Sequence, residues 1–336
     1  MSIVDDGRSR CWVITTGEAG MKSQALGLAS AIGIDYEHKL AMIPAPWKWL
    51  PGYATLGVLS RARLDGVRPA PPWPDLLITC GGRPAILSVA IKRASRGRTL
   101  TVHVQDPRIS PRYFDLVVPP KHDRLSGQNV LSTRGAVHLV TSERLAAART
   151  AFSDTIAESS RPLIGVLLGG ASNSHRGDPE TFAKIGKTLA DMLRQSGGSA
   201  WITSSRRTPE AALNALKESL VGSRYRLWDG SKSKGQGDNP YFAILSAADY
   251  IVVTSDSVSM VTEACATGRP VYVADLPGGT KRFRRFHQDM REEGATRPFS
   301  GRLDAPWAYD PVNDTPAVAA EVRRLLERRD GSSELI

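Results

Sequence analysis

Four loops of the sequence combine glycine, hydroxyl-bearing and charged residues in patterns that suit an anionic ligand. We call them the first glycine loop (residues 16–24), the second glycine loop (residues 169–174), the arginine loop (residues 203–209) and the serine loop (residues 254–260). Glycines let the backbone approach a phosphate closely, helix N-termini present free N–H groups, and arginine binds phosphate through paired hydrogen bonds. These residue types predict a ligand that carries phosphate.

The serine loop is the most specific of the four. Ser255, Ser257 and Ser259 stand where a predicted strand runs into a helix, so their hydroxyls can cap that helix and donate to an anion. Glu263 lies about one turn further into the helix, where a carboxylate can accept hydrogen bonds from both hydroxyls of a ribose. The structural alternative makes Asp256 and Ser257 simple helix caps and Glu263 a surface charge.

The two glycine loops each follow an apolar run of strand type. In the first, Gly17 and Gly20 permit close approach of a ligand, but their spacing is not the dinucleotide fingerprint, and a tight turn is the alternative. In the second, Gly169, Gly170 and Ser172 supply the small residues that a phosphate-binding nest requires. No Walker A motif accompanies either loop, which argues against an ATPase.

The arginine loop places Arg206 and Arg207 directly after a predicted strand. Two guanidinium groups there can clamp a phosphate in bidentate geometry, and the neighbouring hydroxyls supply further donors. A solvated cap before the next helix is the alternative.

The elements that position these loops alternate between apolar strands and amphipathic helices. Strands are expected at residues 11–16, 75–79, 100–104, 116–118, 163–168, 200–203, 225–228, 250–253 and 270–274. Helices are expected at residues 21–32, 84–94, 179–195, 209–220, 241–247, 257–267 and 317–328. Continuous apolar strands separated by helices predict an α/β fold of two doubly wound, Rossmann-like domains that face a cleft. Ligands bind at the carboxyl ends of such strands, where the four loops lie.

The chain divides into three predicted parts. Residues 1–160 form an N-terminal Rossmann-like domain, and residues 161–316 form a C-terminal Rossmann-like domain. Residues 317–336 form a C-terminal helix and tail that can cross back to the N-terminal domain.

The charge of the 336-residue chain also points to an anionic partner. Lys and Arg number 44 against 34 Asp and Glu, a net charge of +10. Such a surplus suits nucleic acid, anionic lipid or a phosphorylated ligand. No helix-turn-helix, RNA-recognition or zinc-finger pattern occurs, so nucleic acid is not expected. The sequence does not indicate an oligomeric state.

An aromatic, proline-rich segment at residues 42–59 is a second lead. Trp47, Trp49 and Tyr53 can sit at a bilayer interface beside Lys48, which predicts contact with an anionic membrane surface or lipid acceptor. The alternative is a loop and helix packed on the N-terminal domain.

The cysteines and the start of the chain predict a cytoplasmic location, with peripheral attachment to the inner membrane as a further option. Cys11, Cys80 and Cys265 lie far apart in apolar runs, which is typical of buried, reduced thiols. Residues 1–10 have no apolar core, so no secretory signal is expected, and no apolar stretch is long enough to span a membrane.

The serine loop with Glu263 and the following residues 266–271 resembles the donor site of glycosyltransferase-B enzymes, such as the N-acetylglucosamine transferase of peptidoglycan synthesis and lipid A disaccharide synthase. The resemblance implies that Gly170, Ala171 and Ser172 face a diphosphate and that Glu263 holds a ribose. It implies a nucleotide-diphosphate sugar donor of the uridine type on the side of residues 161–316, and an acceptor on the side of residues 1–160. It implies no bound cofactor or metal.

A longer resemblance, over about residues 11–300, is to the mitochondrial fission (elongated-mitochondria) family. The matching segments are residues 12–20 with Gln24, 105–108, 114–118, 122–123, 129–130, 205–209, 239–241 and 254–260. These segments add Asn239, Asp256 and Met260 to the predicted ligand-binding residues. This family implies a glycosyltransferase-B-like fold, and its plant members recruit a dynamin-type GTPase, so a non-catalytic recruitment protein with a degenerate nucleotide-sugar site is the alternative to a sugar transferase.

The general base is the open point of the transferase hypothesis. The peptidoglycan-type enzymes have a histidine after the first glycine loop, and Met21 stands at that place here. Glu18, Asp106 and His122 are the predicted substitutes, because each follows a strand or glycine turn of the N-terminal domain.

Overall fold

The structure is a computed structural model that describes residues 11–229 and 239–333. The prediction that concerns residues 1–10 lies outside the described residues. The chain folds as two compact units: the first comprises Met1–Leu139 with Asn313–Ile336, and the second comprises Val140–Val312.

The first unit is built on a twisted sheet that is six-stranded in the described part of the chain, in the order β3-β2-β1-β4-β5-β6. The strands are β1 (Cys11–Thr15), β2 (Tyr36–Met42), β3 (Arg63–Leu64), β4 (Leu76–Cys80), β5 (Leu100–Val104) and β6 (Leu116–Val118). All pairs are parallel except β2 with β3. Up to residue 139, its helices are α1 (Ala19–Ile32), α2 (Val58–Arg61) and α3 (Ala85–Ala94), with short 3-10 turns at Pro111–Tyr113 and Lys121–Asp123.

The second unit repeats the plan with all described strands parallel, in the order β12-β11-β10-β7-β8-β9. Its strands are β7 (Leu163–Leu168), β8 (Ser199–Ser204), β9 (Tyr225–Trp228), β10 (Tyr250–Thr254), β11 (Val271–Ala274) and β12 (Thr296–Pro298). Its helices are α4 (Ser142–Ala151), α5 (Ser153–Ala157), α6 (Pro179–Ser196), α7 (Glu210–Ser219), α8 (Tyr241–Ala247), α9 (Val258–Cys265) and α10 (Lys281–Glu292). The prediction of two doubly wound, Rossmann-like domains is confirmed.

Each sheet has a point where the chain order reverses, between β1 and β4 in the first unit and between β7 and β10 in the second. The loops that leave the carboxyl ends of such neighbouring strands diverge to opposite faces of the sheet and leave room for a ligand. The second glycine loop follows β7 and the serine loop follows β10, so both lie at the reversal point of the second unit.

The two units divide earlier in the chain than the predicted boundary after residue 160. Helix α4 belongs to the second unit because its apolar side chains pack on that unit's core. Phe152, just after α4, packs against the buried Trp201, and their ring centroids are 6.2 Å apart. Arg149 of α4 donates a hydrogen bond to the Ser246 carbonyl at 2.9 Å.

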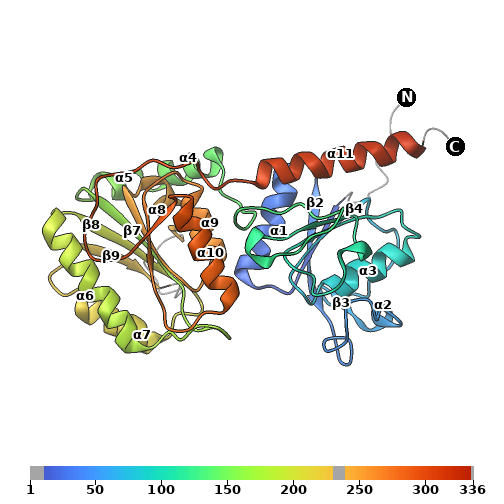
Figure 1. The fold of residues 1–336 in the computed structure, drawn as a ribbon, viewed down its shortest axis with the longest axis horizontal. Helices are drawn as coiled ribbons and strands as arrows, with labels where there is room; N and C mark the ends of the chain where they lie inside the picture. The colour runs from blue at the N-terminus through green and yellow to red at the C-terminus, as the bar shows by residue number, and fades with distance from the viewer. Residues whose placement is uncertain (1–10, 230–238, 334–336) are drawn as a thin grey trace. The chain divides into compact units, whose positions relative to one another are not determined.

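Helix α11 (Thr315–Ser333) returns to the first unit, as the sequence predicted, and lies beside α1 (Figure 1). Val318 and Val322 are buried in the same apolar cluster as Leu28 of α1. Arg323 donates hydrogen bonds to the last carbonyls of α1, at 2.9 Å from that of Ala31. The helix therefore completes the core of the unit in which the chain starts.

Cys11, Cys80 and Cys265 are buried free thiols, as predicted. Burial raises the pKa of Cys11 to about 12, so this thiol is protonated and unreactive at neutral pH. Within the described residues, we find no helix with the length and apolar character needed to cross a bilayer.

Candidate functional site

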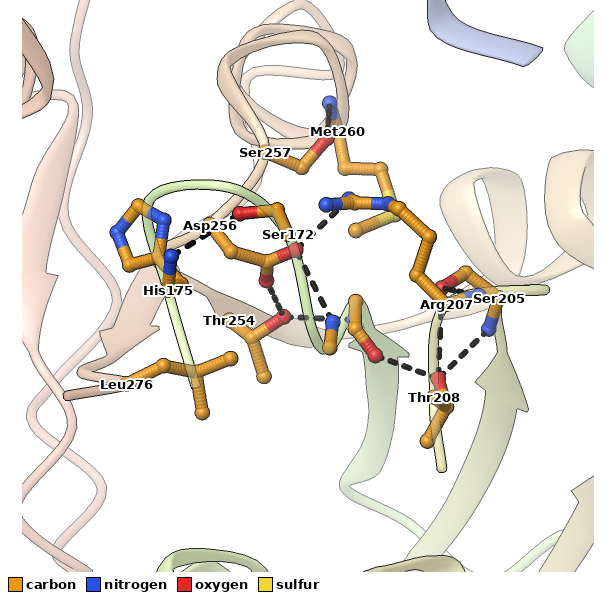
Figure 2. Close-up of polar contacts among 12 residues, drawn as sticks. Ser172, His175, Ser205, Arg207, Thr208, Thr254, Asp256, Ser257, Met260 and Leu276 are labelled. Atoms are coloured by element: carbon orange, nitrogen blue, oxygen red, sulfur yellow. Dashed lines mark hydrogen bonds and ion pairs between the residues drawn. The ribbon is translucent and has the colours of Figure 1, made fainter. Parts of the chain in front are cut away.

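Asp256 is the centre of the polar site at the reversal point of the second sheet (Figure 2). Its buried carboxylate accepts hydrogen bonds from the Gly170 N–H at 3.0 Å and from the Thr254 hydroxyl at 2.7 Å. The Arg207 guanidinium forms an ion pair with the same carboxylate at 2.7 Å. Asp256 thus joins the serine loop, the second glycine loop and the arginine loop, and it is not the helix cap of the structural alternative.

The glycines of the second glycine loop are required by this packing. A Cβ on Gly169 would lie 2.1 Å from Asp256 Oδ1, and a Cβ on Gly170 would lie 2.2 Å from the carbonyl oxygen of Arg207. Both approaches are closer than any real Cβ contact, so neither position tolerates a side chain without movement of the neighbouring loop.

The backbone N–H groups of this loop already have partners within the protein. Gly169 donates to Thr254 Oγ1 at 2.7 Å, Ala171 to the Arg207 carbonyl at 2.9 Å, and Ser172 to the His175 carbonyl at 3.0 Å. The predicted phosphate nest is therefore closed at these positions, and an anion there would bind mainly to side chains.

Side chains that can donate surround this closed loop. Ser172 is exposed, and its Oγ accepts the N–H groups of Ser174 and His175 at 3.2 and 3.1 Å, which leaves the hydroxyl proton to donate outward. Arg206 is exposed, and the Arg207 side chain is 39% exposed although one of its nitrogens is held by Asp256. Arg207 is thus fixed in place while it keeps N–H groups that can reach a ligand.

The serines of the serine loop have different roles. Ser257 is the N-cap of α9, and its Oγ accepts the Met260 N–H at 3.3 Å. Ser255 is buried, and its hydroxyl accepts the Leu276 N–H at 2.9 Å. Ser259 and Met260 are partly exposed on the first turn of α9. The cap alternative holds for Ser257, and Ser255 serves the packing of the loop that follows β11.

Glu263 is buried in α9 at 5% exposure, so it is not a surface charge. Its carboxylate accepts a hydrogen bond from the hydroxyl of Tyr241, the first residue of α8. Burial and the neighbouring Glu263 together raise the pKa of Tyr241 well above its usual value. Asn239 is exposed just before α8, and its Oδ1 accepts the Tyr241 N–H at 3.1 Å.

The predicted bases lie in the first unit, and they differ in access to solvent. Glu18 is exposed after β1, where its carboxylate accepts the Thr16 hydroxyl at 2.6 Å. Asp106 is partly exposed after β5 and accepts the Arg108 N–H at 2.7 Å. His122 is 1% exposed, with Nε2 at 3.4 Å from the buried Asp123 carboxylate. Glu18 and Asp106 can therefore contact an external substrate, whereas the enclosed His122 has the environment of a structural residue.

The glycines of the first glycine loop serve its turn at the carboxyl end of β1. Gly17 has a φ of +92°, which favours glycine, and Gly20 lies in the first turn of α1. The backbone of Gln105 is also left-handed, with a φ of +77°. Its side-chain Nε2 donates a hydrogen bond to Oε1 of the buried Gln24 at 3.2 Å. A left-handed non-glycine residue beside a strand end marks a constrained edge of the first sheet.

Sequence reasoning missed His175 and Tyr241 as site residues. His175 is 5% exposed and packs edge-on against Phe283 of α10, with 4.6 Å between ring centroids. It directly follows the second glycine loop, and this position in the sequence could have indicated a site residue. Tyr241 lay within the family segment at residues 239–241, but its partner Glu263 could not be inferred from sequence.

Two Rossmann-like units, each with its loops gathered at a strand-order reversal, define a protein of the glycosyltransferase-B-like fold class. The chain belongs to the family described as Mitochondrial fission ELM1, whose model matches residues 19–326. This family and fold are those that the sequence resemblance implied.

Three known proteins illustrate the similarity. The Mitochondrial fission protein ELM1 of Arabidopsis thaliana is 27% identical over 96% of this chain and 92% of that protein. The structure of Methanocaldococcus jannaschii UDP-GlcNAc 2-epimerase in complex with UDP-GlcNAc and UDP matches at a TM-score of 0.52, with 12% identity over 94% of this chain and 98% of that one. The structure of Os79 from O. sativa in complex with UDP also matches at a TM-score of 0.52. The identity is 10%, and the match covers 97% of this chain and 94% of that one. At these identities, the two structures show the fold alone.

Proposed function

We propose that the second unit binds a nucleoside diphosphate sugar, of the uridine type, and that the protein transfers the sugar to an envelope or lipid-linked acceptor. The observation that carries the proposal is the buried Glu263 carboxylate in α9, behind a helix start that three polar loops surround. A carboxylate held in this way can accept hydrogen bonds from ribose hydroxyls, which a surface glutamate would do weakly in competition with water.

The arginine loop supplies the positive charge that the leaving diphosphate requires. Arg207 neutralises the buried Asp256, and the exposed part of its guanidinium can stabilise negative charge that develops on a phosphate. Because Asp256 fixes the guanidinium beforehand, little conformational entropy is lost when the ligand binds. The complexes with UDP in the two structural neighbours support a uridine nucleotide as the first ligand to test.

The acceptor is assigned to the first unit, where Glu18 and Asp106 are the bases to test. Each carboxylate lies at the carboxyl edge of the first sheet and is open to solvent. Replacement of the true base by its amide should abolish transfer and leave nucleotide affinity unchanged.

The proposal is tested by calorimetric titration of the full chain with UDP, UDP-sugars and ADP. Glu263→Gln and Arg207→Gln should each lower the affinity for uridine nucleotides by about tenfold, because each removes a charge-assisted hydrogen bond to the nucleotide. Glu180→Gln is the matched control, since the Glu180 side chain is 79% exposed on α6. Unchanged affinity in both site variants, or no nucleotide binding by the unaltered protein, would refute the proposal.

A second candidate is the non-catalytic recruitment protein. It is favoured by membership of the mitochondrial fission family and by the Tyr241 hydroxyl, which occupies the Glu263 carboxylate. Nucleotide-sugar binding without release of free nucleotide, in the presence of lipid-linked acceptors, would favour this candidate over the transferase.

We further propose that the first unit contacts an anionic membrane surface through residues 40–67. Among the described residues, this stretch holds all the exposed large apolar side chains except Val221. Trp49 is 73% and Leu56 is 93% exposed, and the Lys48 ammonium lies 4.5 Å from the Trp49 ring centre. Trp47 instead packs on the core and donates to the Leu56 carbonyl at 3.0 Å, so the packed alternative holds for that residue.

Co-sedimentation with vesicles that contain phosphatidylserine tests this surface. The double variant Trp49→Ser with Lys48→Ser should reduce the bound fraction, because an interfacial aromatic and a cation are both lost. Val221→Ser, an 84% exposed position in the second unit, is the control. Equal binding of both variants would exclude residues 40–67 as the contact.

A further inference from the structure

The turn between β11 and α10 is fastened to the second glycine loop and the residues that follow it. Gly279 donates its N–H to the Ser174 carbonyl at 2.7 Å, and Arg176 donates to the Pro277 carbonyl at 2.9 Å. A Cβ on Gly278 would lie 2.3 Å from the Ser174 oxygen, and both Gly278 and Gly279 have left-handed φ values, of +117° and +81°. The start of α10 is therefore held against the candidate site.

The His175 ring fills this junction. The residue is 5% exposed, its ring packs against Phe283 in the first turn of α10, and its Nε2 lies 3.1 Å from the point where a Cβ on Gly279 would be. Among the described residues, Nδ1 of His175 is buried and has no hydrogen-bond partner. A buried polar nitrogen without a partner is costly and needs an explanation, which a bound ligand would supply.

The N-terminus of α10 is open and positively charged. Thr280 is its N-cap but makes no side-chain cap hydrogen bond, and the first turn has no acidic residue. Lys281 and Arg284 are exposed there, and the Arg284 guanidinium donates to the Gly279 carbonyl at 3.1 Å. A helix N-terminus whose N-cap side chain makes no cap hydrogen bond, with cations nearby, favours an anion at this end of the helix.

We propose that the His175 ring, the Gly278–Gly279 turn and the N-terminus of α10 form a second anion subsite. It receives an anionic group of the ligand beyond the phosphate held by Arg207. This inference rests on the proposed function, since it defines a second part of the same ligand site. The shared chemistry is a negatively charged oxygen group, which either the second phosphate of the nucleotide or the carboxylate of an acidic sugar supplies.

The charges around His175 make this subsite sensitive to pH. Burial lowers the pKa of His175, Asp256 and Asp275 oppose that shift, and Arg207 adds to it. His287 of α10 also interacts electrostatically with His175, and its own pKa is lowered mainly by burial. His175 is therefore neutral in the free protein at neutral pH, and an anion would favour its protonated form. Affinity for the anionic group should rise as the pH falls from 7.5 toward 5.5, roughly the range about an unperturbed histidine pKa.

The experiment compares UMP, UDP, UDP-glucose, UDP-glucuronate and inorganic pyrophosphate by calorimetry on the full chain. His175→Asn and Arg284→Gln should each lower the affinity for the ligand that occupies the subsite by about tenfold. The affinity for UMP should not change. Arg291→Gln is the matched control, because Arg291 lies in the last turn of the same helix. Arg284 is exposed, so its variant remains informative if His175→Asn fails to fold.

The arms separate the two sources of charge. Loss of affinity for UDP, UDP-glucose and pyrophosphate identifies the second phosphate, whereas loss for UDP-glucuronate alone identifies an acidic sugar. In either case, the rise of affinity at low pH should vanish in His175→Asn.

The outcomes also separate this inference from the proposed function. If Arg207→Gln weakens every nucleotide and neither subsite variant weakens any ligand, the inference is wrong and the proposed function stands. If only pyrophosphate binds, and the subsite variants weaken it, the inference stands and the nucleotide function is wrong. If the unaltered protein binds none of the five ligands, both are refuted.

Discussion

The hydroxyl of Tyr241 donates a hydrogen bond to the carboxylate of Glu263, and so joins the start of α8 to the middle of α9. This bond satisfies a carboxylate that is 5% exposed. It also occupies an atom that the proposed function assigns to a ribose. The pair is therefore a test of whether Glu263 serves folding, ligand binding or both.

Tyr241→Phe should lower the free energy of unfolding by about 1–3 kcal/mol, because the buried carboxylate loses a donor. Urea denaturation followed by circular dichroism measures the change. In the same variant, uridine nucleotides should bind at least as tightly as in the unaltered protein, since the carboxylate oxygen becomes available. A loss of affinity would mean that the tyrosine itself contacts the ligand.

Asp256→Ala should lower the free energy of unfolding by about 3 kcal/mol or more, because an ion pair and two further hydrogen bonds are lost together. The expected change in Asp256→Asn is smaller, since the amide oxygen can still accept one of those bonds. Chemical denaturation of both variants measures the two free energies of unfolding and shows which variant loses more. Equal stability of the alanine variant and the unaltered protein would show that Asp256 does not hold the loops together.

Gly169→Ala should destabilise the second unit, because its Cβ would overlap the Asp256 carboxylate at 2.1 Å. The expected loss is about 1–3 kcal/mol, the usual cost of overpacking. Gly82→Ala is the control, since its Cβ would meet only the flexible Arg108 side chain at an ordinary 3.4 Å. Melting temperatures of the two variants provide the comparison, and equal values would contradict the packing argument.

Acid should destabilise the protein through His103, a buried side chain on β5 of the first sheet. Burial lowers the pKa of His103 from 6.5 to about 3. The unfolded chain therefore takes up a proton that the folded chain refuses, so stability is fully present above pH 6.5 and is lost as the pH falls toward 3. In this window, His103 contributes a slope of up to about 1.4 kcal/mol per pH unit.

Urea denaturation between pH 7 and pH 4 measures this slope. His103→Gln should reduce it, while other buried histidines such as His287 keep the remainder. A slope that does not change in the variant would contradict the assignment to His103.

The parallel strands of both sheets could be predicted closely from sequence, because strands buried on both faces are continuous apolar runs. Residues 163–168 and 225–228 were predicted with the bounds that β7 and β9 have. Strand β2 was not predicted. Its Tyr-Glu-His-Lys start is polar, and most of its side chains are at least partly exposed beside the two-residue β3.

The candidate site could be predicted only as a set of loops. The role of Asp256 depends on Gly170 and Arg207, which are far away in the chain. From sequence, Asp256 was therefore predicted only as a ligand-binding residue, with a helix cap as the alternative. Burial of Glu263 and of His122 likewise results from tertiary packing, which a single sequence does not report.

The return of α11 to α1 has a consequence for synthesis on the ribosome. The second unit is complete in sequence by Val312, but the core of the first unit still lacks Val318 and Val322 at that point. We therefore expect the unit that is translated second to reach its folded state first. The first unit completes its fold only after α11 has left the ribosome, because until then the apolar side chains of α1 that pack on α11 remain uncovered.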